Sequence, residues 1–225
     1  MSALLPAVRP SGRTGGAFLL ARGAVRVAIF IDWQNVYWGA REAFGFERRP
    51  SGYGNFSPFQ LGRLLAAANG RGCDGRLVGV EVFRGQPSPA RDRIGYAANR
   101  RQAAAWEAEA PGVVVSRTRP LRYPPTYPSN PPVEKGVDVE LAVSALGAVL
   151  RSRCDVAVVF SHDSDLRPVP EAIADLAGAG CVETAAWIGP TFKQRISPKP
   201  VVAHHALTER VFRLVSTPVN YARKQ

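Results

Sequence analysis

The sequence contains few cysteines and no long apolar run, and each shortage excludes a class of protein. Its 225 residues include 3 cysteines, Cys73, Cys154 and Cys181, and none of them forms a C-x-x-C pair. An odd, scattered set argues against a disulfide framework or a zinc finger, so we expect reduced thiols and a cytoplasmic location. No apolar run reaches the roughly 18 residues that a membrane span requires, so we expect no membrane partner.

Acidic residues are also in deficit. The chain has 18 Asp and Glu against 29 Lys and Arg, which gives a formal net charge of +11 at pH 7. This excess indicates a polyanionic partner, although a GC-rich genome would enrich arginine without any such function. Part of the excess lies in residues 1–24, which contain Arg9, Arg13 and Arg22 but no acid. We interpret residues 1–24 as a flexible leader, with an over-long gene start or a transit peptide as the alternatives.

Apolar, β-branched runs alternate with helical segments along the rest of the chain. The predicted strands are 25–31, 77–83, 113–115, 156–160 and 182–188. The predicted helices are 35–44, one that begins at the capping box Ser57 to Gln60, 88–110, 137–150, and one that includes 171–177. This alternation predicts a three-layer α/β/α fold with a central, mainly parallel sheet of roughly five strands.

Two segments lie outside this alternation. Residues 120–132 are rich in proline and cannot form regular structure. Residues 191–225 are basic and interrupted by proline, and we interpret them as an extension that packs on the domain or trails from it, with a short helix at 207–214. The domain itself is predicted to span residues 25–190.

Aspartates follow two of the predicted strands. Asp32 ends the first strand, and Asp163 and Asp165 follow the fourth. Asp138 lies at the start of helix 137–150, which is apolar on nearly every side and is therefore predicted to be buried. If the first and fourth strands are neighbours, these acids meet at one edge of the sheet, where ligands of parallel sheets bind.

Several carboxylates in one cleft repel each other unless a cation or a proton neutralises them. Hard oxygen ligands suit Mg²⁺ or Mn²⁺, which can activate a water and stabilise the leaving oxygen of a phosphodiester. The residues that we expect to bind such an ion are Asp32, Asp138, Asp163 and Asp165.

Each polar residue also has a simpler structural interpretation. Asp32 could cap the following helix, and Asn35 could be a turn residue. Asp138 could pair with Lys135, and Asp163 or Asp165 could cap the helix that enters at Pro168. Glu134 has the character of an ordinary loop acid. For each position taken alone the structural interpretation is favoured, but their joint placement favours a metal site.

Three motifs in this order resemble the NYN domain of the PIN-like nuclease superfamily, including its LabA-like branch. They are F-I-D-W-Q-N-V at 30–36, K-G-V-D-V at 135–139 and S-H-D-S-D-L at 161–166. The resemblance covers roughly residues 25–190 and implies a PIN-like doubly wound sheet, cleavage of RNA, and Mg²⁺ or Mn²⁺ at Asp32, Asp138, Asp163 and Asp165.

The resemblance also implies roles for the neighbours of these acids. Asn35 would orient a ligand water or the substrate, and Lys135 would lie near the scissile phosphate. Ser161 and Ser164 would hydrogen-bond the acids beside the substrate. The chain departs from the family at His162, where the family pattern has Gly, and a side chain there could narrow the pocket or contact substrate.

Arginines flank the predicted acidic edge and are candidates to bind single-stranded RNA. They are Arg84, Arg91, Arg117, Arg119 and Arg122. Tyr123 and Tyr127 are available to stack on bases. The alternative is that these arginines only solvate two loops and one helix face. Further partners left open by the resemblance are an antitoxin or an RNA-processing protein, and the oligomeric state stays open as well.

Competing functions are less consistent with the sequence. A non-catalytic RNA-binding scaffold would be expected to have lost one of the acids, yet all are present, and a structure-specific DNA nuclease remains an alternative. A haloacid-dehalogenase phosphatase would need Asp at Gln34, and a dinucleotide site would need G-x-G-x-x-G after the first strand. His204 and His205 could suggest a transition metal, but adjacent residues of a strand point to opposite sides.

Overall fold

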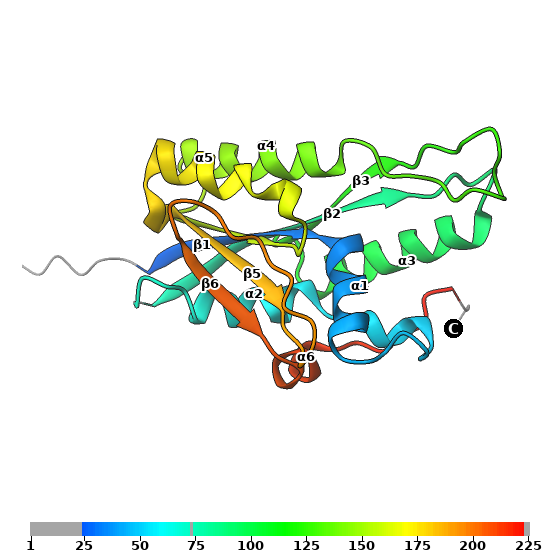
Figure 1. Cartoon of the computed structure of the whole chain (residues 1–225), viewed down its shortest axis with the longest axis horizontal. Helices are drawn as coiled ribbons and strands as arrows, with labels where there is room; N and C mark the ends of the chain where they lie inside the picture. The colour runs from blue at the N-terminus through cyan, green and yellow to red at the C-terminus, as the bar shows by residue number, and fades with distance from the viewer. Residues whose placement is uncertain (1–23, 73, 223–225) are drawn as a thin grey trace, which may run out of the picture.

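A parallel sheet forms the centre of the molecule in the computed structural model, which describes residues 24–72 and 74–222 (Figure 1). Its strands are β1 Val25–Asp32, β2 Gly75–Gln86, β3 Val114–Pro120, β4 Val156–Phe160, β5 Val182–Trp187 and β6 Ala203–Leu207. The 6 strands have the order β3-β2-β1-β4-β5-β6, and every neighbouring pair is parallel. The predicted parallel sheet is confirmed, with β6 as an additional strand.

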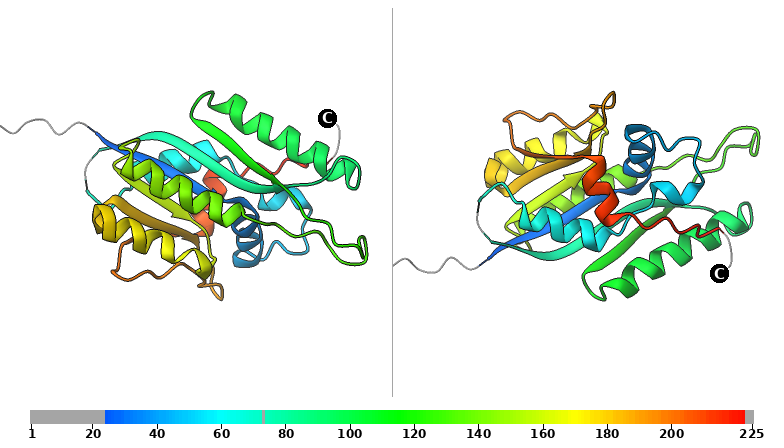
Figure 2. Two further views of the ribbon diagram at one scale, coloured as in Figure 1. Left: turned by 90° about the horizontal axis from the view of Figure 1, so that it is seen from above. Right: turned by 90° about the horizontal axis from the view of Figure 1, so that it is seen from below.

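Helices cover both faces of this sheet (Figure 2). The helices are α1 Trp33–Ala43, α2 Pro58–Ala67, α3 Arg93–Glu109, α4 Val137–Leu150, α5 Pro168–Ala177 and α6 Glu209–Val215. Short 3₁₀ helices lie at η1 Ser51–Gly54, η2 Ser164–Leu166 and η3 Ala179–Cys181. Helices α4 and α5 pack on one face, and α1, α2, α3 and α6 pack on the other. The predicted three-layer α/β/α, PIN-like fold is therefore confirmed.

Strand β1 is apolar at nearly every position because both of its faces are buried. Ile29 and Ile31 pack in the core beneath α1, α2 and α3, whereas Ala28 and Phe30 pack beneath α4 and α5. A central strand of a parallel sheet has no solvated face, so the alternation of polar and apolar residues disappears. The first polar side chain after this run is Asp32, at the carboxyl edge.

Local sequence rules placed several helix ends correctly. Ser57 caps α2, since its Oγ accepts a hydrogen bond of 3.1 Å from the backbone N–H of Gln60. The reciprocal half of the capping box is absent, because the Gln60 side chain donates to Glu109 instead. Helix α3 begins at Arg93 rather than 88, because Asp92 accepts from the Gly95 N–H and caps it there.

Helix α4 has the predicted bounds but not the predicted burial. Leu141 and Ala145 are buried against the sheet, whereas Val139 and Val143 on the opposite side are each 65% exposed. The prediction of a helix buried on every side is therefore wrong. Asp138 is also exposed, on the first turn of this helix.

The predicted C-terminal extension is part of the sheet. Strand β6 pairs with β5 in parallel, and Phe212 of α6 lies in the same core as Ile29. The expected short helix is confirmed as α6. The predicted leader lies outside the described residues, except for Ala24.

The described residues also bear on membrane spans and on the state of the cysteines. None of the helices resolved there combines the length and the apolar character that crossing a membrane would need. Cys154 and Cys181 are both free thiols, as expected.

Candidate active site

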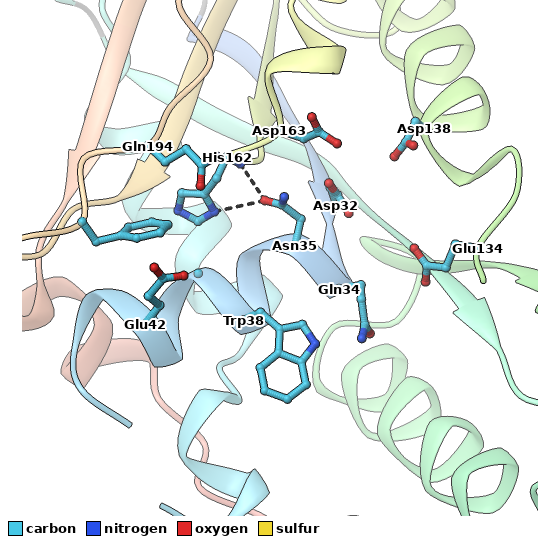
Figure 3. Close-up of a pocket in the computed structure, with 12 residues that line it drawn as sticks. Asp32, Gln34, Asn35, Trp38, Glu42, Glu134, Asp138, His162, Asp163 and Gln194 are labelled. Atoms are coloured by element: carbon cyan, nitrogen blue, oxygen red, sulfur yellow. Dashed lines mark hydrogen bonds between the residues drawn. The ribbon is translucent and has the colours of Figure 1, made fainter. Parts of the chain in front are cut away.

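The carboxyl ends of β1 and β4 meet at one edge of the sheet, because these two strands are neighbours. Ile31 pairs with Phe160. Asp32 and Ser161 are the next residues along the two strands and therefore lie side by side at this edge. Helix α4 begins at the same edge, after Gly136 turns the chain with φ 76°, a left-handed conformation that favours glycine. The polar groups of three separate segments therefore surround one pocket (Figure 3).

Asp32 is the buried acid of this pocket. Only 4% of it is exposed, and its carboxylate accepts a hydrogen bond of 2.8 Å from Ser161 Oγ. The pKa of Asp32 is raised to about 7, mainly by burial and also by the neighbouring carboxylates of Asp138 and Glu134. The Ser161 hydroxyl and the Asn35 N–H lower it in part. A cation bound nearby would stabilise the charged form of a carboxyl group that is buried and surrounded by other acids.

Asn35 is held in one orientation by hydrogen bonds from β4. Its Oδ1 accepts from the backbone N–H of His162 at 2.7 Å, which fixes Oδ1 as the acceptor because a backbone N–H can only donate. The backbone N–H of Trp187 donates to His162 Nε2 at 3.0 Å, so the neutral ring carries its proton on Nδ1. That Nδ1–H then donates to the same Asn35 Oδ1, at 3.1 Å. Asn35 is left with its Nδ2 as a donor for a ligand.

His162 itself is buried, with 2% of the residue exposed. Burial lowers the pKa of His162 to about 4, so the ring is neutral at physiological pH. Its nitrogens are both engaged, by Trp187 and by Asn35. The side chain predicted to narrow the pocket or contact substrate therefore lines the pocket and also orients Asn35.

Gly39 makes room for the His162 ring. A Cβ at this position of α1 would lie 2.3 Å from His162 Cε1, well inside van der Waals contact. The histidine after β4 and the glycine in α1 are therefore a matched pair.

The remaining acids are more open to solvent. Burial raises the pKa of Asp138, and the carboxylates of Asp163 and Asp165 raise it further. Asp163 caps η2 by accepting a hydrogen bond of 2.8 Å from the Asp165 N–H. Neither acid caps α5, whose N-cap residue is Arg167. The alternative ion pair of Asp138 with Lys135 is absent from the described residues.

The pocket has a volume of about 360 Å³. The predicted site residues that line it are Asp32, Asn35, Asp138, His162 and Asp163. The predicted residues outside this lining are Asp165, Lys135, Ser161, Ser164, Arg84, Arg91, Arg117, Arg119 and Arg122. Ser161 nevertheless contacts Asp32 directly, and Asp165 lies close enough to affect the pKa of Asp138.

Sequence reasoning overlooked several lining residues, which are Gln34, Trp38, Gly39, Glu42, Glu134, Phe192 and Gln194. Glu134 precedes the motif at 135–139 and was interpreted as a loop acid. Its Oε1 instead accepts from the Gly85 N–H at 2.5 Å, and burial raises its pKa. Trp38 lies one helical turn after Asn35, so helical spacing could have identified it. Nothing in the sequence near Phe192 indicated this site.

Most of the predicted RNA-binding arginines have other partners. Arg117 pairs with Glu81 and Arg119 with Glu140, each at 3.1 Å. Arg91 lies over the ring of Tyr123 at 5.4 Å. Tyr123 and Tyr127 contact each other edge to face, with ring centroids 4.8 Å apart. Arg122 is held by backbone hydrogen bonds with Val133, which leave its guanidinium available.

The donor set is compatible with a divalent ion that keeps several coordination positions open for waters and substrate. In the part of the chain that the structure describes, no three His, Cys, Asp or Glu side chains stand close enough to bind one ion. The predicted aspartates therefore do not form a closed cage. Mg²⁺, however, is usually held by one or two carboxylates and completes its shell with waters and substrate phosphate. The desolvated Asp32 beside Asp138 supplies donors of this kind.

The alternative of a transition metal at His204 and His205 is not supported. His204 Nδ1 lies 2.8 Å from Thr184 Oγ1, and His205 Nε2 lies 2.5 Å from Glu183 Oε2. The two rings thus bind different partners on β5, as expected for adjacent residues of a strand.

Comparisons with known proteins gave two results besides the family match described below. A solved structure, the crystal structure of a protein of unknown function, VPA0982 from Vibrio parahaemolyticus RIMD 2210633, is 16% identical, with a TM-score of 0.46. The alignment covers 77% of this chain and 86% of that chain. No curated protein matches this sequence.

The family model of the NYN domain matches residues 26–177, which include all three motifs. NYN domains are generally nucleases of the PIN-like superfamily and act on nucleic acids. The match is to the family as a whole, so the LabA-like branch stays a prediction. Because the match extends over well more than half of the sequence, this chain belongs to the NYN domain family.

Proposed function

We propose that this protein is a metal-dependent endoribonuclease that hydrolyses RNA phosphodiester bonds in the acid pocket. The observation that carries the proposal is the desolvated Asp32, whose pKa of about 7 reflects burial beside further carboxylates. A buried carboxylate in an acidic cleft of a basic chain suits a cation that in turn binds a polyanion. Mg²⁺ and Mn²⁺ are the cations that suit such oxygen donors.

Asp32 and Asp138 would hold the ion, with Asp163 and Asp165 beside them. A bound ion of this type lowers the pKa of a water and stabilises negative charge on the leaving oxygen. Ser161 holds Asp32 in place through its hydroxyl, and the Asp163 N–H donates to that same hydroxyl at 3.0 Å. The two ends of β1 and β4 thereby keep a fixed distance, which positions the acids before substrate arrives.

The other residues bind and orient the phosphate. Asn35 presents its Nδ2 as a donor to a phosphate oxygen or to the attacking water, because its Oδ1 is occupied. Lys135 does not line the pocket but follows the lining residue Glu134, and its ammonium group would have to reach toward the substrate to bind the phosphate. Hydrolysis adds water to phosphorus, breaks the bond to the leaving oxygen, and transfers a proton to that oxygen.

The experiment is a substrate comparison under defined metal conditions. Labelled RNA and DNA of the same sequence, and a generic phosphomonoester, are incubated with Mg²⁺, Mn²⁺ or EDTA. We expect internal cleavage of RNA that requires metal and stops with EDTA. Preferential cleavage of DNA would support the DNA nuclease instead. RNA binding without cleavage in any metal would support the non-catalytic scaffold.

A further inference from the structure

A groove leads from the acid pocket along the carboxyl edge of the sheet. The acid pocket shares Gln34 and Glu134 with a second cavity of about 500 Å³. That cavity shares Gln34, Arg84 and Gln102 with a third one of about 170 Å³, which extends between α1 and α3. Gln34 lines all three, so the cavities adjoin one another around its side chain. We call the second and third cavities together the Arg84 groove.

Arg84 lies in this groove without an ion pair to any described residue, although the Glu134 carboxylate lines the same cavity and favours the charged form of Arg84. Its guanidinium lies over the rings of both Trp33 and Trp106, at 5.8 and 5.6 Å from their centroids. Nη1 donates to Gln102 Oε1 at 2.7 Å, but among residues 24–72 and 74–222 its Nε has no hydrogen-bond partner and no carboxylate lies within ion-pair distance. Burial lowers the pKa of Arg84 to about 10, so the group is still charged at neutral pH.

This environment differs from that of the neighbouring arginines. Arg117 and Arg119 on β3 are more exposed and are each paired with a glutamate. A guanidinium removed from water without a directly paired anion is unfavourable, and an anion that hydrogen-bonds to it would offset that cost. A second unsatisfied group lies in the same groove, because Asn99 is 3% exposed and its Oδ1 has no partner in the described part of the chain. The groove therefore offers a cationic donor for an anion, at Arg84, and an acceptor oxygen for a donor group of the same ligand, at Asn99.

The strand register fixes where Arg84 lies relative to the acids. Asp32 pairs with Phe83 on the neighbouring strand, across a strand spacing of about 4.8 Å. Arg84 is the next residue after Phe83. Phe83 packs on the α4 side of the sheet and Val82 on the α1 side, so Arg84 projects to the α1 side. A chain that crosses the edge at Gln34 would meet Asp32 on one face and Arg84 on the other.

We propose that Arg84 binds the backbone phosphate next to the scissile phosphate, in a single-stranded RNA that follows the Arg84 groove. The inference rests on the proposed function, since it places the scissile phosphate at Asp32. The intervening nucleoside lies near Gln34, whose amide faces all three cavities. Arg84 is the predicted RNA-binding arginine that lines this groove, and the guanidinium fork matches the geometry of a phosphate.

The test compares Arg84→Gln with Arg117→Gln as the matched control. Arg117 pairs in register with Phe83, on the next strand, and lies outside all three cavities. Cleavage is measured on a dinucleotide with one phosphodiester and on longer single strands. For the longer strands we expect Arg84→Gln to lower kcat/KM about ten- to a hundredfold, the value of a charge-assisted hydrogen bond. On the dinucleotide Arg84→Gln should have no effect, and Arg117→Gln should change neither substrate.

A modified substrate gives a second measurement that needs no variant. One charged phosphate beside the cleavage site is replaced by a neutral methylphosphonate, and wild-type protein should then cut it as slowly as Arg84→Gln cuts the unmodified strand. Equal losses on the dinucleotide and the longer strand would overturn the proposal, as would a methylphosphonate without effect. If wild type cuts no RNA at all, the proposed function fails. The role of Arg84 is then tested by the affinity of the wild type for the unmodified strand and for the methylphosphonate strand. Weaker binding of the methylphosphonate strand would support it, and equal binding would overturn it.

Discussion

The two sides of the acid pocket are built in opposite ways. The side at β1 and β4, which we call the fixed side, consists of Asp32, Asn35, Ser161 and His162, all joined by hydrogen bonds. The side at α4 and η2, which we call the open side, consists of Asp138, Asp163 and Asp165 and is largely exposed to solvent. The fixed side has its geometry before any ligand arrives, whereas the open side can adjust to one.

This difference suggests a division of labour. Groups that orient a reacting phosphate work best when their own partners hold them in place. Carboxylates that accept an ion together with substrate must instead tolerate waters and changing ligands. We therefore expect substitutions on the open side to abolish metal-dependent chemistry, and substitutions behind the fixed side to weaken it by misplacing Asn35.

The largest effect is expected for Asp138→Asn on the open side. Asn keeps the size of Asp but removes the charge that holds a hard cation. Cleavage should therefore fall by more than about a hundredfold, which is more than the loss expected when a residue only hydrogen-bonds to a metal ligand. Folding and RNA binding should be retained, because Asp138 makes no ion pair within the described residues. Single-turnover cleavage, a thermal melt and an RNA titration measure the three properties.

Glu140→Gln is the matched control for this variant. Glu140 lies on the same first turn of α4, but it pairs with Arg119 at 3.1 Å and does not line the pocket. It should keep wild-type activity. A folded Asp138→Asn protein with full metal-dependent activity would remove Asp138 from the mechanism.

A smaller effect is expected behind the fixed side, at His162. Replacing His162 by Ala removes the Nδ1–H that donates to Asn35 Oδ1, so the carboxamide gains freedom. Since His162 acts through Asn35, we expect a loss of about 10- to 100-fold in kcat with little change in KM.

A double-mutant cycle with Asn35→Ala separates this role from a general loss of structure. If His162 acts by positioning Asn35, the double variant should be no slower than Asn35→Ala alone. Additive losses would show that His162 acts elsewhere. A thermal melt of each variant accompanies the kinetics, because His162→Ala also leaves the Trp187 N–H without its acceptor.

The comparison between the two sides also explains how far the sequence could be interpreted. The acids could be located because each follows an apolar strand or opens an apolar helix, and those are local patterns. The sequence could not reveal the contacts of His162, because they join segments far apart in the chain. His162 contacts Gly39, Asn35 and Trp187. Likewise, β6 pairs with β5 although its sequence A-H-H-A-L is short and carries two histidines. Tertiary pairing decides such strands more than their own composition.

A third prediction concerns the stability of the fixed side without metal. The pKa of Asp32 is raised from 3.8 to about 7 in the folded protein, first by burial. Between these values the folded state binds a proton that the unfolded state has lost, so Asp32 lowers stability as the pH rises from about 4 to 7. In EDTA, Asp32→Asn should therefore be more stable than wild type, by on the order of 4 kcal/mol at pH 8, and equal to it near pH 4.

Urea unfolding of both proteins at several pH values measures this difference. Ser161 Oγ can still donate to the amide oxygen of the variant, so the two proteins differ mainly in the charge at position 32. Asp163→Asn is a suitable control, because Asp163 is less buried and caps η2. An Asp32→Asn protein no more stable than wild type at pH 8 would contradict the buried, high-pKa assignment.

The smallest effect is the stabilisation of the wild type by metal alone, because the open side provides few ligands before substrate is present. An ion that binds only the folded state adds about 1.4 kcal/mol at a tenfold excess over its Kd, or roughly 3–6 °C in Tm for a protein of this size. The ion must displace the proton of Asp32, so the shift should be larger at pH 8 than at pH 6. Melting with millimolar Mn²⁺ and with EDTA at both pH values tests this, and Asp32→Asn should lose most of the shift at either pH. Equal shifts in wild type and Asp32→Asn would mean that Mn²⁺ binds elsewhere, and the division between a fixed and an open side would then not describe the metal site.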